Sequence, residues 1–110
     1  MDVFEAVAEP TRRTVLDLLA DRERTAGELV AAFPLLTQPS VSRHLRILRE
    51  SLLVDVRAEG TRRVYSLKPD ALAELDRWLA HYRRFWSGRL DALEGHLDAK
   101  ARSAHEDAAR

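Results

Sequence analysis

Apolar positions in the first third of the chain repeat at the spacing of α-helices. A short helix is predicted over residues 2–8, and a second begins at Pro10, where the missing proline N–H costs nothing. Thr25 and Glu28 form a capping-box pattern, which predicts the start of a third helix that Pro34 ends. The inward face of the second helix is predicted from its apolar residues Val15, Leu16, Leu18 and Leu19.

The stretch QPSVSRHLRIL, residues 38–48, predicts a fourth helix with two different faces. Thr37 is placed to cap it, and Pro39 fits its first turn. Its inward stripe is Val41, Leu45 and Leu48, whereas Ser40, Arg43 and Arg46 fall on the opposite side. Two short capped helices joined by a tight turn form a helix-turn-helix pattern.

The spacing then changes from helical to alternating. Gly60 is a turn signal between the stretches LVDVRAE and TRRVYSL, which predicts a β-hairpin. One face of its first strand is predicted to hold Val54, Val56 and Ala58, and the other Asp55, Arg57 and Glu59. Arg57, Arg62 and Arg63 are expected near the tip of this hairpin.

From Leu72 to Leu97, apolar residues recur in heptad-like steps of three and four. The stripe predicts a helix of about 27 residues, which is ~40 Å long at ~1.5 Å per residue. A body this small cannot bury the aromatic residues of such a helix, so part of its face is expected to meet a second copy. Residues 98–110 lack large apolar side chains and are predicted to form a frayed or disordered tail beyond one domain, residues 1–97.

Composition limits the classes of function. The 110 residues include no cysteine, which excludes disulfides, thiolate metal sites and cysteine nucleophiles. Neither a signal peptide nor a stretch of ~20 apolar residues is present, so the sequence predicts a cytoplasmic protein. A glycine-rich phosphate loop and paired carboxylates beside a histidine are also missing, and we do not expect an enzyme.

The net charge is zero, but the charges are distributed unevenly. Residues 1–36 carry four arginines and seven acidic residues (−3), and residues 69–110 carry seven basic and eight acidic residues (−1). Residues 37–68 carry seven basic and three acidic residues (+4). The basic excess lies in the segment that contains the helix-turn-helix and the hairpin, which favours a polyanionic partner such as DNA.

Four stretches at the joints of these elements carry a family resemblance: EPTRRTVLDLL, TAGELVAAF, TQPSVSRHLRILRE and VRAEGTRRVYSL. Over about residues 3–97 the chain resembles the ArsR/SmtB family of bacterial transcriptional repressors. The resemblance implies a mainly α winged helix-turn-helix with a β-hairpin wing and a long C-terminal dimerisation helix. It also implies a homodimer that binds an imperfectly palindromic double-stranded DNA operator and represses transcription, often of its own operon.

In such a complex the fourth helix, the recognition helix, enters the major groove and the wing follows the DNA backbone or the adjacent minor groove. Gln38 can pair with adenine and Arg43 with guanine, whereas Arg46 is expected on phosphate. The predicted DNA-binding residues are Thr37, Gln38, Ser40, Ser42, Arg43, Arg46, Arg62 and Arg63. The predicted dimer interface is Phe4, Leu75, Leu79, Tyr82, Trp86, Leu90 and Leu93.

Other residues near these sites receive a structural interpretation. His44 is expected to pack or to contact the backbone rather than to read bases, and Tyr65 is expected to pack. Arg12 and Arg13 fit two interpretations equally well, a contact with the DNA backbone or a solvated surface.

The sequence departs from the family at its sensing and hinge positions. The helix TAGELVAAF has no metal-binding cysteine, and neither His81 nor His96 has a His, Asp or Glu four residues away. We therefore expect no metal and no other cofactor, as in the branch of the family without the metal-sensing ligands. Leu52 replaces the glycine that usually follows the recognition helix and more easily adopts positive φ, so we expect this helix to run on or to end differently.

Two alternatives stay open at this stage. A winged helix can bind protein instead of DNA, because the fold does not fix the function. A DNA-binding regulator can also hold a small-molecule ligand in the dimer seam, near Trp78, Tyr82 and Trp86.

Overall fold

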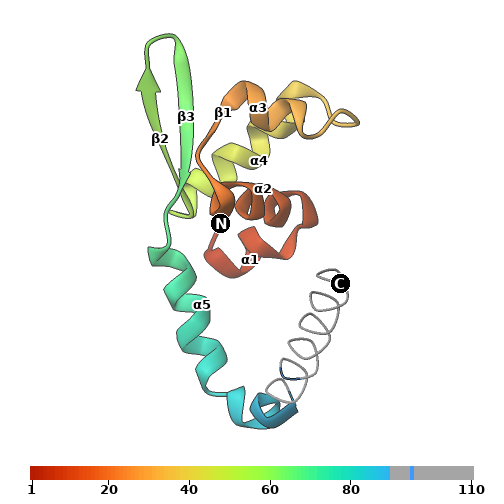
Figure 1. Ribbon diagram of the computed structural model, residues 1–110, viewed down its shortest axis with the longest axis vertical. Coiled ribbons are helices and arrows are strands. Elements are labelled where there is room, and N and C mark those ends of the chain that lie inside the picture. Colours follow the sequence, from red (N-terminus) through yellow and green to blue (C-terminus); the bar gives the residue numbers. More distant parts are fainter. Residues whose placement is uncertain (90–94, 96–110) are drawn as a thin grey trace, which may run out of the picture. The chain divides into compact units, whose positions relative to one another are not determined.

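The computed structural model describes residues 1–89 and 95 of the chain. The chain forms two compact units, with the boundary between Asp76 and Arg77, and each unit is described by itself. The elements of the first unit, labelled in Figure 1, are α1 (Val3–Ala8), α2 (Pro10–Asp21), β1 (Arg24–Thr25), α3 (Ala26–Ala31), α4 (Gln38–Glu50), β2 (Val54–Glu59), β3 (Arg62–Leu67) and the start of α5 (Asp70–Ala80).

Side-chain caps fix the starts of the first four helices. The oxygens of Asp2, Glu9, Thr25 and Thr37 each accept a hydrogen bond from a backbone N–H three residues on, at 2.9 to 3.2 Å. Such bonds satisfy donors that have no partner within the helix. At Thr25 the Glu28 carboxylate also accepts from the Thr25 N–H, which confirms the capping box. The third helix ends at Ala31, three residues before Pro34, the residue predicted to end it.

The core lies where α1 to α4 and the base of the sheet meet. Val41, Leu45 and Leu48 of α4 are at most 3% exposed, which confirms the predicted inward stripe. They belong to one cluster with Val15 and Leu29 from the two preceding helices. Tyr65 is also buried there, as expected for a packing residue.

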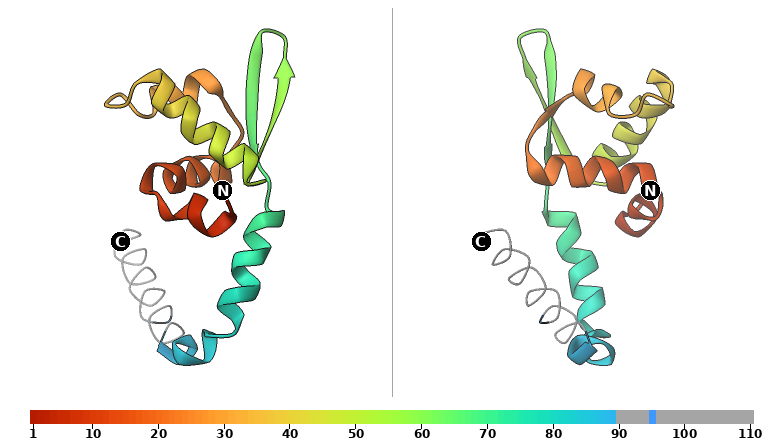
Figure 2. Two further views of the ribbon diagram at one scale, coloured as in Figure 1. Left: turned by 180° about the vertical axis from the view of Figure 1, so that it is seen from behind. Right: turned by 45° about the vertical axis from the view of Figure 1, so that its right-hand side comes forward.

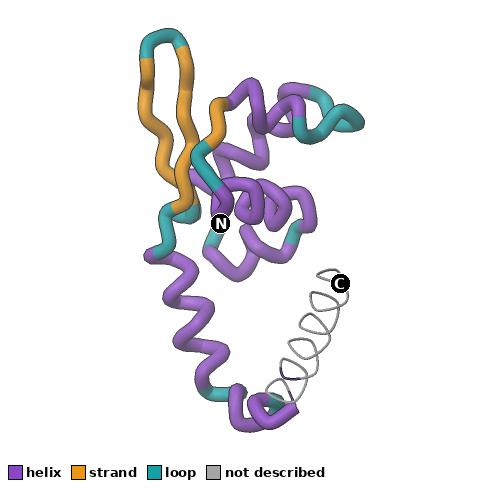
Figure 3. Tube along the Cα trace, viewed as in Figure 1, coloured by secondary structure: helices purple, strands orange, loops and turns teal. Residues whose placement is uncertain are grey.

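The sheet has three antiparallel strands in the order β1-β3-β2. The predicted hairpin is present, with a two-residue turn between Glu59 and Arg62 and a φ of 63° at Gly60. In both views of Figure 2 it extends beyond the helices as a wing. Strand β1 was not predicted; it pairs Arg24 with Tyr65 and Thr25 with Val64. Figure 3 shows the loop that joins α3 and α4.

The end of α4 corrects the expectation based on Leu52. The helix neither runs on nor loses its tight ending, because Leu52 itself adopts a φ of 61°. The Leu53 N–H donates to the Leu48 carbonyl at 3.0 Å, and the Leu52 N–H donates to the Arg49 carbonyl at 3.1 Å. This is the Schellman motif that a glycine usually completes. Burial of Leu48 and Leu53 holds the turn closed.

The continuous helix predicted over residues 72–97 is wrong for residues 81–86. Helix α5 ends at Ala80, and a 3-10 helix follows at Arg83–Phe85. The residues HYRRFWSG after Ala80 are mostly weak helix formers, since aromatic side chains and glycine lose conformational freedom in a helix. The predicted tail, residues 98–110, lies outside the described residues, and no described helix is long and apolar enough to cross a membrane.

Candidate nucleic-acid interface

The outer face of α4 presents polar and basic side chains to solvent. Thr37 caps the helix through its Oγ1, which accepts from the Ser40 N–H at 3.2 Å. This cap fixes the first turn, which carries Gln38 and Ser40; the other candidate contact residues of α4 follow in later turns. Ser40 is half-buried, and the exposed residues of the predicted set are Thr37, Gln38, Ser42, Arg43 and Arg46.

The wing adds a second pair of exposed arginines. Arg62 faces Glu59 across the hairpin, and Arg63 faces Ala58. Neither arginine, nor Arg43 or Arg46 on α4, makes a hydrogen bond or ion pair through its side chain with another described residue. Four guanidinium groups are thus available to an external anion.

Arg57, also expected near the tip, has a different role. Its guanidinium forms ion pairs with Glu23 at 2.8 Å and with Glu59 at 3.0 Å. Glu23 lies between α2 and β1, so the first pair ties β2 of the wing to the body of the protein. Arg57 therefore anchors the wing in the structure.

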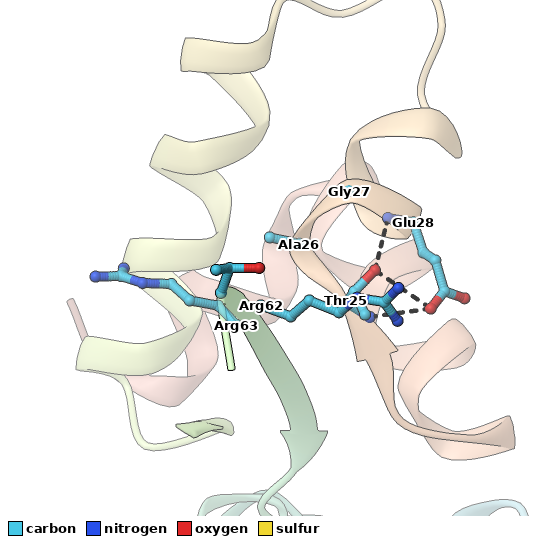
Figure 4. Close-up of a pocket in the computed structure, with 7 residues that line it drawn as sticks. Thr25, Ala26, Gly27, Glu28, Arg62 and Arg63 are labelled. Atoms are coloured by element: carbon cyan, nitrogen blue, oxygen red, sulfur yellow. Dashed lines mark hydrogen bonds between the residues drawn. The ribbon is translucent and has the colours of Figure 1, made fainter. Parts of the chain in front are cut away.

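Two hollows that share Ala26, Gly27 and Arg63 in their linings together form a groove between the wing and the helix-turn-helix. One part, about 650 Å³, is lined by Thr25, Ala26, Gly27, Glu28, Thr61, Arg62 and Arg63. A second part, about 420 Å³, is lined by Ala26, Gly27, Val30, Ala31, Gln38, Ser42, Leu45, Arg63 and Tyr65. Arg63 lines both parts, so it brings the wing beside Gln38 and Ser42 of α4. Figure 4 shows the Arg62 and Arg63 side chains extending in opposite directions from β3.

One acidic residue lies in this groove, but its charge is compensated. The Glu28 carboxylate accepts from the Thr25 N–H and lies 2.9 Å from a guanidinium nitrogen of Arg22. The hydrogen bond from Thr25 and then the contact with Arg22 lower the pKa of Glu28, so that it stays ionised at neutral pH. Its repulsion of an incoming phosphate is reduced by the paired arginine.

Sequence reasoning missed two threonines that line the groove. Thr25 was recognised only as a cap, although it also pairs with Val64 in the sheet and so joins α3 to the wing. Thr61 follows Gly60 at the hairpin turn and carries an exposed hydroxyl. Its place beside two arginines in the sequence GTRR was the available signal.

Arg12 fits neither of its two sequence interpretations, because it is buried. Its side chain is 7% exposed and its Nη1 lies 3.2 Å from Nδ1 of His44. His44 is thus engaged inside the protein, in agreement with the expected packing role. Arg13 is exposed, and its guanidinium donates to the carbonyls of Val7 and Ala8 at the end of α1.

The predicted dimer residues have different surroundings within their own units. Phe4 of α1 is exposed, and Leu75 packs partly against the core of the first unit. In the second unit the Trp78 and Tyr82 rings lie 5.1 Å apart, and both are exposed. Leu79 is exposed and Trp86 is half-buried, whereas Leu90 and Leu93 lie outside the described residues.

Comparison with known proteins agrees with this arrangement. The family model described as "Bacterial regulatory protein, arsR family" matches residues 9–56, from the start of α2 to β2. The chain is 38% identical over 97 residues to the HTH-type transcriptional regulator Rv2034 of Mycobacterium tuberculosis, which covers 88% of this chain and 87% of that protein. It is 35% identical over 81 residues to the transcriptional repressor SdpR of Bacillus subtilis, covering 74% and 89%.

A solved structure gives the same result for the fold. The homodimeric winged helix-turn-helix DNA-binding domain of Mb0332 from Mycobacterium bovis, a possible ArsR-family transcriptional regulator, superimposes with a TM-score of 0.59. It is 28% identical and covers 77% of this chain and 80% of that one. The predicted winged helix-turn-helix is confirmed, and relatives of 35% and 38% identity match over most of their length. The chain therefore belongs to the ArsR family of bacterial regulatory proteins.

Proposed function

We propose that this protein is a cytoplasmic, homodimeric repressor that binds double-stranded operator DNA. The observation that carries the proposal is a set of four exposed arginines whose side chains have no hydrogen-bond or ion-pair partner among the described residues: Arg43, Arg46, Arg62 and Arg63. The groove that Arg63 shares with Gln38 and Ser42 supports it, because one duplex can then contact helix and wing together. The relatives named as transcriptional regulators support the same function.

One face of α4 packs against the core, and the opposite face is proposed to contact DNA. Val41, Leu45 and Leu48 fix the helix to the core. On the outer face, Gln38 and Arg43 are proposed to read base edges, with Ser40 and Ser42 beside them. Arg46 and the Thr37 hydroxyl are proposed to bind phosphate, while Arg62 and Arg63 bind phosphate or enter the minor groove.

The dimer interface is proposed to combine α1 with α5 and the segment after it. Phe4, Leu79 and Tyr82 are exposed apolar or aromatic side chains, whose burial between two copies releases water from apolar surface. Each copy then presents one α4 helix to one half of a two-fold symmetric site.

Selection from a pool of random duplexes tests the function. We expect enrichment of an imperfect inverted repeat whose half-sites lie about one helical turn apart, because the two α4 helices of a dimer read successive major grooves. Sedimentation of the complex should give two chains per duplex. Recovery of no sequence above the input pool would contradict the proposal and favour a winged helix that binds protein.

Two further expectations stay predictions. A small-molecule effector near Trp78, Tyr82 and Trp86 is proposed because the Trp78–Tyr82 pair is exposed, and quenching of tryptophan fluorescence by candidate ligands would reveal it. Metal analysis of the purified protein is the measurement for the expectation that no metal is bound.

A further inference from the structure

A buried arginine joins α4 to the corner between α1 and α2. The Nε of Arg12 donates to the Ala6 carbonyl at 2.7 Å, and its Nη2 donates to the Glu5 carbonyl at 3.2 Å. These bonds satisfy carbonyls near the end of α1, which have no N–H partner within that helix. The third nitrogen, Nη1, donates to Nδ1 of His44 at 3.2 Å. One guanidinium therefore holds the end of α1 and the middle of α4 together.

The contact with His44 has only one possible direction. A guanidinium group donates hydrogen bonds and never accepts them, so Nδ1 of His44 must carry a lone pair. The ring proton of the neutral imidazole then lies on Nε2. Protonation of His44 removes the only acceptor that the ring offers to Arg12, and it places two positive charges side by side.

A carboxylate also lies near the same nitrogen. Oε2 of Glu9 lies 3.7 Å from Nδ1 of His44. Burial alone would raise the pKa of Glu9, but hydrogen bonds from the backbone N–H groups of Arg12 and Thr11, together with His44, outweigh it and lower the pKa. Glu9 therefore carries its negative charge at neutral and at mildly acidic pH. Among the described contacts of His44, the charged groups are Glu9 and Arg12.

His44 is adjacent in sequence to Arg43 and two residues before Arg46, the proposed DNA contacts of α4. We propose that His44 is a positioning residue for DNA binding: as acceptor for Arg12 it fixes α4 in its DNA-binding position, and on protonation it exchanges Arg12 for Glu9 and weakens operator binding. This inference rests on the proposed function, since operator binding is what the position of α4 controls.

Variants of His44 separate positioning from general effects. His44→Asn retains an acceptor oxygen close to the place of Nδ1 but does not titrate, whereas His44→Ala removes the acceptor. His105→Asn is the matched control, because it removes a histidine remote in sequence from α4. The measured quantity is the ratio of the affinity for the selected duplex to the affinity for a scrambled duplex of equal length. It is determined at pH 7.5 and at pH 5.5, at constant ionic strength. This ratio removes the general gain in affinity that added positive charge gives to all DNA.

In the wild type and in His105→Asn, we expect the ratio to fall about tenfold between pH 7.5 and 5.5, the size of effect that one lost hydrogen bond to a charged group gives. In His44→Asn the affinity ratio should be the same at both pH values. In His44→Ala the affinity ratio should be low at both pH values. A fall in His44→Asn equal to that of the wild type would overturn the positioning role, as would wild-type affinity in His44→Ala. If His44→Ala does not fold, the pH dependence of the affinity ratio in His44→Asn alone tests the positioning role.

Nitrogen NMR of the free protein adds a readout that needs no DNA. At pH 7.5 the His44 ring should carry its proton on Nε2, and a proton on Nδ1 would overturn the inference. Failure of the duplex selection would reject the proposed function. Intact operator binding with the same pH profile in the wild type and His44→Asn would reject the positioning role alone.

Discussion

At the scale of single residues, Leu52 shows how strongly a turn can be determined by its neighbours. A residue other than glycine in the left-handed region costs roughly 1–2 kcal/mol. Leu52 adopts this conformation, and burial of its own side chain does not offset the cost, because the residue is 58% exposed. The compensation comes from the adjacent backbone hydrogen bonds and from the buried Leu53. Leucine can thus take the place of the usual family glycine with the same turn geometry, but it lowers the free energy of unfolding.

Leu52→Gly should therefore stabilise the protein. Relief of the backbone strain exceeds the extra unfolded-chain entropy of glycine, and we expect the free energy of unfolding to rise by about 0.5–1 kcal/mol. Urea unfolding monitored by circular dichroism measures the change. Leu52→Ala is the control, because it keeps the strain and should change the free energy of unfolding by less than about 0.5 kcal/mol. A glycine variant no more stable than the wild type would contradict the interpretation.

The arginines of α4 and of the wing should differ in the kind of binding they support. We expect Arg43→Ala to lower operator affinity and to relax the base preference, since each good bidentate base contact discriminates by ~1–3 kcal/mol. Arg62→Ala should weaken binding to every duplex about equally, because phosphate carries no sequence information. Titrations with operator and random DNA measure both effects. Equal losses on the two duplexes for both variants would refute this division of roles.

At the scale of elements, strand pairing and an ion pair both help to attach the wing to the body. Strand β1 contributes only two residues of pairing, and the Arg57–Glu23 ion pair adds an attachment at the same level of the hairpin, because Arg57 and Thr25 both pair with Val64. A pair this exposed contributes at most about 1 kcal/mol to stability. Its effect on the wing is larger than that figure suggests, because an outlying hairpin reorients through few contacts.

Glu23→Ala and Arg57→Ala distinguish an anchor from a DNA contact. If the pair anchors the wing, both variants should weaken DNA binding by a similar factor, about two- to fivefold for a contact of this kind. The melting temperature should change little. If Arg57 instead bound phosphate, Arg57→Ala would weaken binding while Glu23→Ala would strengthen it by removing a negative charge. Opposite signs in the two titrations would thus reject the anchoring role.

Much of the fold was predictable because its signals are local. The starts of α3 and α4 follow from Thr25 and Thr37, whose cap bonds span three residues. The hairpin follows from alternation around Gly60. Strand β1 has no such signal, since two residues show no periodicity and the partner of Thr25 is Val64. The end of α5 was missed because the heptad-like stripe continues through residues that favour helix weakly.

The candidate site was predictable on its outer surface and not beneath it. Exposed Arg43 is found by its charge and helical spacing, and exposed Arg62 by its charge beside the predicted hairpin turn. The role of Arg12 depends on carbonyls six and seven residues earlier and on a histidine thirty-two residues later. Those separations match no periodic pattern, so only the folded chain brings the three partners together.

At the scale of the whole molecule, binding should depend steeply on salt despite the zero net charge. Each neutralised phosphate contributes about −0.9 to the slope of log K against log salt. Three or four phosphate contacts per subunit predict a slope of roughly −5 to −7 for a dimer. Titration at several potassium chloride concentrations measures it. A slope near half this value would indicate that one subunit alone engages the DNA.

Two groups of arginines among the described residues differ in how freely they can be replaced. Arg12, Arg24 and Arg57 are committed to contacts within the fold, so their replacement disturbs the structure. The second group makes no side-chain hydrogen bond or ion pair with other described residues and consists of Arg43, Arg46, Arg62 and Arg63. After a gene duplication, one copy can therefore change these four positions and acquire a new target site while the scaffold remains intact.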